Sequence, residues 1–138
     1  MPTLIAIFVS IFIIISGCSS APPDIQLSDI VAAPSPIMRG VISVFMRIEN
    51  KGGRDNLVKA STDVAGSFVE LHDIKDGKMV KVKSIKIPSN GKVEMIPGGV
   101  HIMIFNMPKD VSSGYEFTLH LDFEKSGKKS VAVNVPKF

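Results

Sequence analysis

The sequence has a single cysteine, Cys18, among its 138 residues, and it has no tryptophan and only one tyrosine. With one thiol the chain cannot form an intramolecular disulfide. A zinc ribbon, a cysteine-held iron–sulfur cluster and CxxC redox chemistry are excluded for the same reason. Methionine, in contrast, occurs seven times. Soft sulfur donors are therefore present as thioethers and not as thiolates.

The first 23 residues carry no charged side chain, because Asp24 is the first one in the chain. The run Leu4–Ile15 is almost wholly apolar and has twelve residues. A helix needs roughly 20 residues to span a bilayer, so this run fits the hydrophobic core of a signal peptide instead. It leads into Ile15-Ser16-Gly17-Cys18, which resembles the lipobox of bacterial lipoproteins.

We therefore predict a signal peptide over residues 1–17, lipidation of Cys18 after cleavage, and a tether over residues 18–23. An uncleaved hydrophobic anchor with an incidental cysteine is the alternative. In both cases we expect an exported protein, held by its anchor at the periplasmic or extracytoplasmic face of a membrane.

Charge is close to balanced, with sixteen Lys and Arg against thirteen Asp and Glu. Lysines cluster over Lys75–Lys86 and again over Lys125–Lys129, but no aromatic side chains alternate with them as they would on a nucleic-acid platform. We interpret these lysines as solvated strand faces and expect no nucleic-acid partner.

The region 24–138 shows short alternating runs separated by Gly, Pro, Asn and Asp, with no amphipathic helical stripe. This pattern predicts one all-β domain, either a β-sandwich or a small barrel. The eight predicted strands are Ile25–Val31, Val41–Glu49, Ser67–His72, Met79–Ile87, Lys92–Ile96, Val100–Phe105, Tyr115–Phe123 and Lys129–Val135.

Alternation along these strands separates core residues from outward-facing ones. It assigns Met46 and Met95 to the core and turns His120 outward as an ordinary surface histidine. Met38 and Met107 lie beside prolines in predicted loops, where flexible methionines commonly fill gaps.

Two histidines and two methionines occupy strand positions that alternate with the core-facing ones, so they point away from the core. His72 shares its phase with Glu70, and Met79, just after the predicted Asp76-Gly77 hairpin turn, shares a face with lysines. His101 and Met103 project side by side from one face of their strand, and the β-branched residues Val100, Ile102 and Ile104 form the opposite face.

Two imidazoles and two thioethers are neutral, soft to borderline donors that suit Cu(I) and suit Ca²⁺, Mg²⁺ or Mn²⁺ poorly. A blue-copper site would also need a Cys thiolate, and the only cysteine lies in the tether. Phase alone leaves two interpretations open: a metal site, or two surface histidines with two partly buried methionines.

At these residues the chain resembles the periplasmic PCuAC copper chaperones. That family has a first His or Met, a Met ten residues on, twenty-one further residues, and a closing His-x-Met. Here twenty-one residues separate Met79 from His101-Ile102-Met103, and Asn50-Lys51-Gly52-Gly53 and Asp55-Asn56-Leu57-Val58 resemble the family upstream. Only six residues separate His72 from Met79. The difference of four preserves strand phase, so both side chains still face the same way.

The resemblance implies a cupredoxin-like Greek-key β-sandwich. It also implies that His72, Met79, His101 and Met103 bind Cu(I) at a surface-accessible site. The implied recipient is the CuA site of cytochrome c oxidase or another copper carrier. The glycines Gly98-Gly99 fit a tight backbone approach before His101.

Two other functions are compatible with these residues. A copper storage or resistance lipoprotein would use the same residues, and a structural β-sandwich lipoprotein would bind no metal. An enzyme is not expected, because the sequence shows no nucleophile–base arrangement and no pair of off-phase carboxylates beyond Glu70, which we interpret as an unpaired, solvated side chain.

Overall fold

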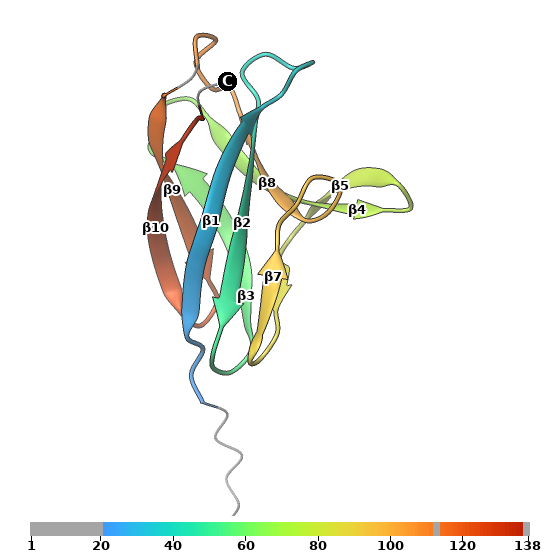
Figure 1. Cartoon of the computed structure of the whole chain (residues 1–138), viewed down its shortest axis with the longest axis vertical. Helices are drawn as coiled ribbons and strands as arrows, with labels where there is room; N and C mark the ends of the chain where they lie inside the picture. Colours follow the sequence, from blue (N-terminus) through green and yellow to red (C-terminus); the bar gives the residue numbers. More distant parts are fainter. Residues whose placement is uncertain (1–20, 112–113, 137–138) are drawn as a thin grey trace, which may run out of the picture.

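The computed structural model describes residues 21–111 and 114–136, and within them it is built from β-strands and loops (Figure 1). The predicted signal peptide and Cys18 lie outside the described residues. The ten strands are β1 (Ile25–Pro34), β2 (Ile42–Asn50), β3 (Asp55–Thr62), β4 (Phe68–Lys75), β5 (Lys78–Val82), β6 (Ile85–Ile87), β7 (Gly91–Glu94), β8 (His101–Phe105), β9 (Glu116–Phe123) and β10 (Gly127–Asn134).

The strands form two antiparallel sheets that pack face to face. A six-stranded sheet has the order β1-β2-β8-β4-β5, with β7 also pairing with β2, and a four-stranded sheet has the order β10-β9-β3-β6. Strands distant in sequence are neighbours in both sheets, as β2 and β8 or β3 and β9 show. This arrangement confirms the predicted β-sandwich and excludes the small barrel.

The core lies between the sheets and is filled by the alternate residues of the paired strands. On β2 the buried phase is Val44, Met46 and Ile48, as predicted, and Met95 is buried as well. From the other sheet, β9 contributes the second large group, which consists of Phe117, Leu119, Leu121 and Phe123. Alternation therefore assigned these faces correctly.

The number of strands differs from the prediction in two places. The predicted strand Met79–Ile87 is two strands, β5 and β6, which belong to different sheets. β3, which pairs with both β9 and β6, is not among the predicted strands. Its register shifts between Leu57 and Lys59, so the buried residues Leu57 and Ala60 are three apart instead of two. Such a bulge disrupts the alternation from which strands are recognised.

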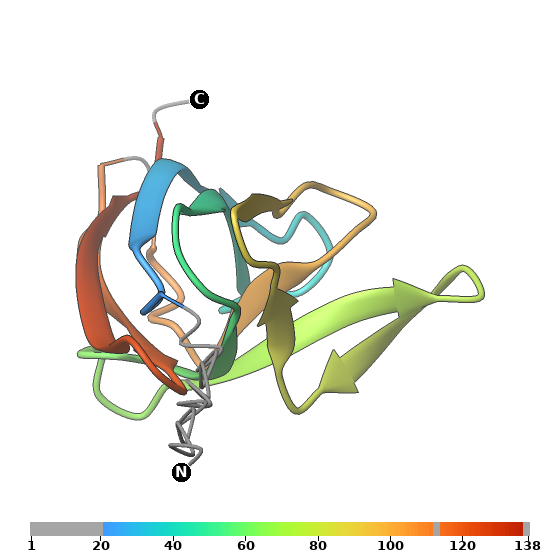
Figure 2. The same cartoon turned by 90° about the horizontal axis from the view of Figure 1, so that it is seen from below.

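The hairpin of β4 and β5 projects from one side of the sandwich, and Figures 1 and 2 both show it extending beyond the other strands. Asp76 and Gly77 form its two-residue turn, and both have positive φ values, 51° and 74°. This is the conformation of the type I′ turn that favours Asp-Gly in hairpins. The predicted turn is thus confirmed.

The segment Asn50–Gly53 has a structural role at the end of β2. The buried Asn50 side chain donates from Nδ2 to the carbonyl oxygens of Gly53 and Pro88, at 2.8 and 2.9 Å. Its Oδ1 accepts from the backbone N–H groups of Asp24 and Gly52, both at 3.0 Å. Asn50 thereby joins the N-terminal segment to two loops of the sandwich.

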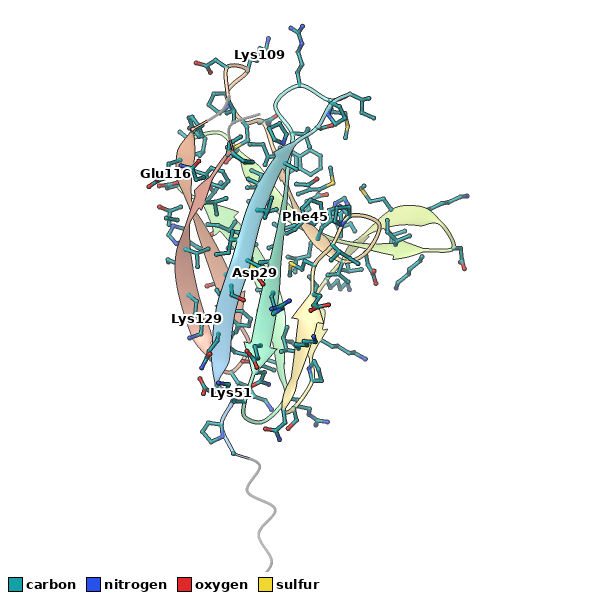
Figure 3. All side chains as sticks on the ribbon, in the orientation of Figure 1. Asp29, Phe45, Lys51, Lys109, Glu116 and Lys129 are labelled. Carbon is teal, nitrogen blue, oxygen red and sulfur yellow. The ribbon has the colours of Figure 1, made fainter. Side chains whose placement is uncertain are left out.

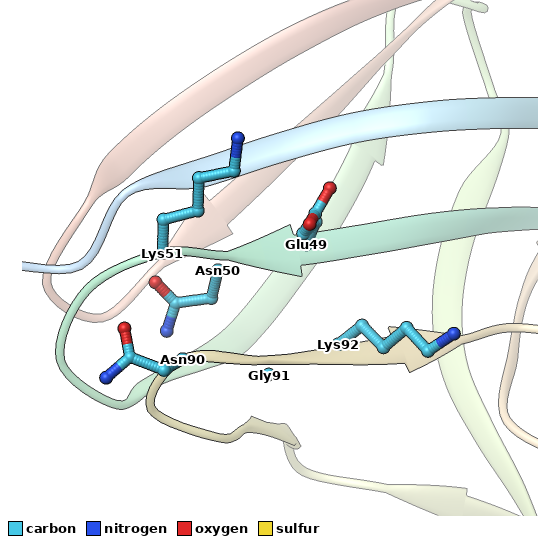
Figure 4. Close-up of a pocket in the computed structure, with 6 residues that line it drawn as sticks. All are labelled: Glu49, Asn50, Lys51, Asn90, Gly91 and Lys92. Atoms are coloured by element: carbon cyan, nitrogen blue, oxygen red, sulfur yellow. The ribbon is translucent and has the colours of Figure 1, made fainter.

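A surface cavity of about 410 Å³ adjoins Asn50, between the end of β2 and the start of β7 (Figure 4). Its lining is polar and charged, and includes Lys51, Asn90 and Lys92. None of the four predicted copper ligands contributes to this lining.

Candidate metal centre

The strand register brings the four predicted donors to one face of the six-stranded sheet. His72 on β4 pairs with His101 on β8, and Glu70 pairs with Met103 two residues further along. Met79 on β5 pairs with Ile74 of β4. Directly paired residues point to the same face, as do residues two apart along a strand. His72, His101, Met103 and Met79 therefore share a face, the one turned away from the core.

The two imidazole rings lie close together where the β4–β5 hairpin leaves the sheet. Their centroids are 5.6 Å apart and their planes are inclined at 48°. With metal–nitrogen bonds of about 2 Å, two imidazoles on one ion have ring centroids separated by no more than roughly 6 Å. The spacing of His72 and His101 is compatible with one shared metal ion.

His101 is oriented by the loop that precedes β8. Its Nδ1 lies 2.8 Å from the carbonyl oxygen of Gly99. A carbonyl oxygen only accepts, so Nδ1 carries the proton and Nε2 keeps a free lone pair in the neutral ring. Nε2 is therefore the nitrogen that His101 can offer to a metal.

A tight turn positions the Gly99 carbonyl. The N–H of Gly99 donates to the carbonyl oxygen of Ile96 at 3.0 Å, and Gly98 has a φ of 83°. Pro97 followed by a glycine with positive φ is the signature of a type II turn. The need for glycine is thus conformational: a Cβ on Gly98 would meet nothing within 4 Å, and one on Gly99 would make only ordinary contacts. The expected close backbone approach at these glycines is not found.

His72 is held in the opposite tautomer. Its Nε2 lies 2.9 Å from Oε2 of Glu70. A carboxylate oxygen accepts the hydrogen bond, so Nε2 carries the proton and Nδ1 keeps the lone pair. Among the described residues, Nδ1 of His72 is the buried side-chain nitrogen or oxygen atom that has no hydrogen-bond partner. Leaving such an atom unpaired costs about 1–3 kcal/mol, and a metal ion would use its lone pair.

Glu70 was interpreted from the sequence as an unpaired and solvated side chain, and this is wrong. Its Oε1 also accepts from Nζ of Lys81, at 2.7 Å. The hydrogen bonds from Lys81 and, second, from His72 lower the pKa of Glu70 below its usual value, against a smaller opposing effect of burial. The carboxylate therefore links the β4–β5 hairpin to the histidine pair. In the sequence, Glu70 lies two residues before His72 and therefore on the same face of the strand. This position was the signal that could have indicated the contact with His72.

Three of the four donors are buried, in contrast to the expected surface-accessible site. The exposed fraction is 8% for His72, 4% for His101 and 3% for Met103. β8 lies between β2 and β4, and aromatic rings from β2 and from β8 itself adjoin the site. The ring of Phe45 is 5.9 Å from that of His101, and the ring of Phe105 is 6.3 Å from that of His72.

Phe45 lies on the side of the molecule that carries the hairpin, whereas the labelled Glu116 and Lys129 lie on the opposite side (Figure 3). The stacked rings of Phe68 and Phe105, 4.9 Å apart, lie at the other end of the β4–β8 pairing. Aromatic side chains thus adjoin the histidine pair and exclude water from part of its surroundings.

Met79 differs from the other donors because it is 50% exposed. It is diagonal to His72 across the hairpin, since Lys81 and not Met79 is the direct partner of His72. Met103 lies on the other side of the histidine pair, opposite Glu70. The site is therefore a compact group of His72, His101 and Met103, with Met79 at its accessible side.

The remaining sulfur and imidazole groups of the residues that the structure describes lie elsewhere. His120 is on β9 in the other sheet, where its Nδ1 lies 2.7 Å from the hydroxyl of Ser130. Met107 is buried in the core and Met38 is exposed in a loop. Within residues 21–111 and 114–136, no three His, Cys, Asp or Glu side chains form a possible metal site. A metal at the histidine pair would accordingly depend on thioether donors.

The comparisons with known proteins agree with this architecture. The chain matches the LpqE-like family, described as "Putative lipoprotein LpqE-like", over residues 25–135. It is 30% identical over 104 residues to "Putative lipoprotein Lxx21020" of Leifsonia xyli subsp. xyli, covering 72% of this chain and 63% of that protein. It is 33% identical over 113 residues to "Uncharacterized protein RP573" of Rickettsia prowazekii, covering 75% and 62%. The chain thus spans less than two-thirds of the length of either relative.

Solved structures share the fold. A copper-bound PCuAC domain from PmoF2 has a TM-score of 0.65 at 23% identity, over 83% of this chain and 93% of that domain. The solution structure of CuI-DR1885 from Deinococcus radiodurans has a TM-score of 0.64 at 22% identity, over 88% and 83%. The predicted cupredoxin-like β-sandwich is confirmed. The part of the chain that the structure describes contains no helix with the length and hydrophobicity needed to cross a membrane.

Proposed function

The chain belongs to the LpqE-like lipoprotein family, and on this premise we propose that it is an exported, lipid-anchored carrier of Cu(I). In this proposal His72, His101 and Met103 hold the ion, and Met79 is the fourth, exposed donor. Copper is the cargo of the protein. The chain supplies binding and release, and no catalytic step is required.

The observation that carries the proposal is the histidine pair. His72 and His101 are buried side by side, and each donates a ring N–H to an oxygen acceptor, which leaves one free lone pair per ring. Met103 lies on the same face, diagonal to His72 across the strand pair. Neutral imidazole and thioether donors match the preference of Cu(I) and disfavour hard cations that need several oxygen ligands.

The asymmetric exposure of the donors suits transfer. Three donors are buried while Met79 is half exposed, so an incoming ligand from a recipient has access at the Met79 side. Thioethers and imidazoles need no reduction before they bind, and thioethers are not consumed by disulfide formation in an oxidising compartment. Transfer by ligand exchange then needs no chemistry beyond the replacement of one donor by another.

The recipient in this proposal is the CuA site of cytochrome c oxidase or another copper carrier. Cleavage before Cys18 and lipidation of its thiol would hold the domain beside a membrane-bound recipient. Such tethering raises the effective concentration of the carrier at the membrane.

Storage or resistance would use the same site, and a deletion strain separates these roles. Loss of oxidase copper indicates assembly, whereas copper sensitivity alone indicates detoxification.

The test of the site is a competitive Cu(I) titration under anaerobic conditions with the full chain in detergent. His101→Ala and Met103→Ala should each lower the Cu(I) affinity at least about tenfold, which is about 1.4 kcal/mol. His120→Ala is the matched control, because His120 lies on the other sheet. Equal affinities for the wild type and all three variants would overturn the site and favour a structural lipoprotein that binds no metal.

A further inference from the structure

Glu70 is the polar side chain at the copper site whose role the proposed function leaves open. It lies on the donor face, opposite Met103 and two residues before His72, and its side chain is 21% exposed. Its two oxygens have different partners: Oε2 accepts from His72 and Oε1 accepts from Lys81. A neutral thioether and imidazole site for Cu(I) needs no carboxylate ligand.

The two histidines form their hydrogen bonds through different ring nitrogens. In His101 the proton is on Nδ1, toward the Gly99 carbonyl, whereas in His72 it is on Nε2, toward Glu70. Both acceptors lack a proton to donate, so each determines the tautomer of its ring. The unprotonated atoms are Nε2 of His101 and Nδ1 of His72.

The burial of Nδ1 in His72 is the second observation. This atom is buried without a hydrogen-bond partner. Transfer of the ring proton from Nε2 to Nδ1 would place a buried N–H there that has no acceptor. The bond to Glu70 opposes that change, because a Nδ1–H tautomer would place an unprotonated Nε2 against the carboxylate. A hydrogen bond to a charged group is strong enough to favour one tautomer at least tenfold.

We propose that Glu70 is a positioning residue that holds His72 in its Nε2–H tautomer, so that the two histidines bind Cu(I) through different nitrogens, His72 through Nδ1 and His101 through Nε2. This inference rests on the proposed copper function. A carboxylate that accepts the second ring N–H of a metal-binding histidine orients the ring and raises its basicity. Lys81 pairs with the other oxygen of Glu70 and so keeps the carboxylate in place from the β5 side.

The test begins with the metal-free protein. Long-range ¹H–¹⁵N NMR spectra of the full chain in detergent, labelled with ¹⁵N in histidine, report the tautomer of each ring directly. The chain has only three histidines, which simplifies assignment. We expect His72 as the Nε2–H tautomer and His101 as the Nδ1–H tautomer. If His72 carries its proton on Nδ1, the inference is overturned without reference to copper.

Three variants then separate positioning from general structural effects. Glu70→Ala removes the acceptor, and it should mix the tautomers of His72 and lower the Cu(I) affinity about 10- to 100-fold. Lys81→Met removes only the second partner of Glu70 and should leave the His72 tautomer unchanged. Asp122→Ala is the matched control, since Asp122 is also a strand carboxylate near a lysine, 3.9 Å from Nζ of Lys128, but lies on the far sheet. A Glu70→Ala protein with the His72 spectrum and affinity of Asp122→Ala would refute the inference.

Copper loading distinguishes a failure of this inference from a failure of the proposed function. Cu(I) is diamagnetic, so the same spectra can be recorded with the ion bound, and the resonances that shift should be Nδ1 of His72 and Nε2 of His101. Shifts at Nε2 of His72 instead would disprove the inference and keep the carrier function. Absence of Cu(I) binding by the wild-type protein, with both tautomers as assigned, would disprove the carrier function and with it the role of Glu70 toward a metal.

Discussion

His72 on β4 and His101 on β8 are direct cross-strand partners, with ring centroids 5.6 Å apart. Their juxtaposition depends on the register of two strands that are distant in sequence. A slip of one residue would turn one of the two imidazoles to the core face, because side chains alternate with a period of two. Phe68 and Phe105 form the pair at the other end of the same register, and their stacked rings help to maintain it.

The two methionines of the site should contribute unequally to Cu(I) binding. Met103 is buried beside the histidine pair, whereas Met79 is half exposed and diagonal to His72. We expect Met103→Ala to lower the Cu(I) affinity at least about tenfold more than Met79→Ala, a difference of about 1.4 kcal/mol. A competitive Cu(I) titration measures both. Equal losses would mean that Met79 is as full a ligand as Met103 and that the hairpin bends toward the site.

The turn before β8 should tolerate alanine at one glycine but not at the other. Gly98 has a φ of 83°, where a residue with a Cβ costs about 1–2 kcal/mol, whereas a Cβ on Gly99 meets only ordinary contacts. Gly98→Ala should therefore lower the free energy of unfolding by about that amount. It should also weaken Cu(I) binding, because the turn carries the carbonyl that orients His101.

Gly99→Ala is the matched control for this substitution, and urea unfolding together with the Cu(I) titration provides both measurements. Similar behaviour of the two alanine variants would show that the left-handed conformation of Gly98 has no part in orienting His101.

Much of the site could be predicted from local sequence, because alternation depends only on neighbouring residues. It placed Met46 in the core and put His101 and Met103 together on the other face, and the structure agrees. Alternation could not show that this second face is also covered. Phe45 reaches His101 from a strand more than fifty residues earlier in the sequence, so the burial of His101 follows from sheet order.

Other features escaped prediction for similar reasons. β3 was missed because its bulge breaks the period of two. Glu70 was misjudged because its partner Lys81 comes from the next strand, and its bond to His72 depends on side-chain conformation. Spacing predicted which residues would hold a copper ion, but which nitrogen of each ring is free depends on acceptors that only the folded chain brings into place.

Acid should destabilise the protein partly through Asp55. Burial raises the pKa of this carboxyl, but the hydrogen bonds from the Ser126 hydroxyl and from the backbone N–H groups of Lys125, Asn56 and Ser126 together lower the pKa below the ordinary value of 3.8. A folded-state pKa below the unfolded value means that the stabilisation is present above about pH 4. It is lost as the pH falls through the lowered pKa.

The measurement for Asp55 is urea unfolding between pH 7 and pH 3. Asp55→Asn should be less stable than the wild type at pH 7, because an amide nitrogen cannot accept the bonds from Ser126, and its stability should change less on acidification. Asp76→Asn is the control, since asparagine is also favoured in the hairpin turn, and it should keep the acid sensitivity of the wild type. An Asp55→Asn protein as acid-sensitive as the wild type would contradict the assigned role.

Replacement of Gly52 should strongly destabilise the fold, although this glycine is far from the histidine pair. A Cβ there would lie 1.9 Å from the carbonyl oxygen of Pro22, which is backbone and cannot rotate away. Gly52→Ala must displace the N-terminal segment, and with it the bonds from Lys51 N–H to Asp24 and from Gly53 N–H to Ala21. We expect a loss of about 2–4 kcal/mol in the free energy of unfolding.

Lys51→Ala is the matched control for Gly52→Ala, because it alters the neighbouring side chain and keeps every backbone hydrogen bond of this loop. Urea unfolding at pH 7 gives the stability of both variants, and hydrogen exchange at the amides of Lys51 and Gly53 localises the change. Cu(I) affinity should stay at the wild-type value in Gly52→Ala protein that is still folded, because the loop lies at the end of β2 remote from Phe45 and His101. A stability within about 0.5 kcal/mol of Lys51→Ala would show that residues 21–24 can move aside freely.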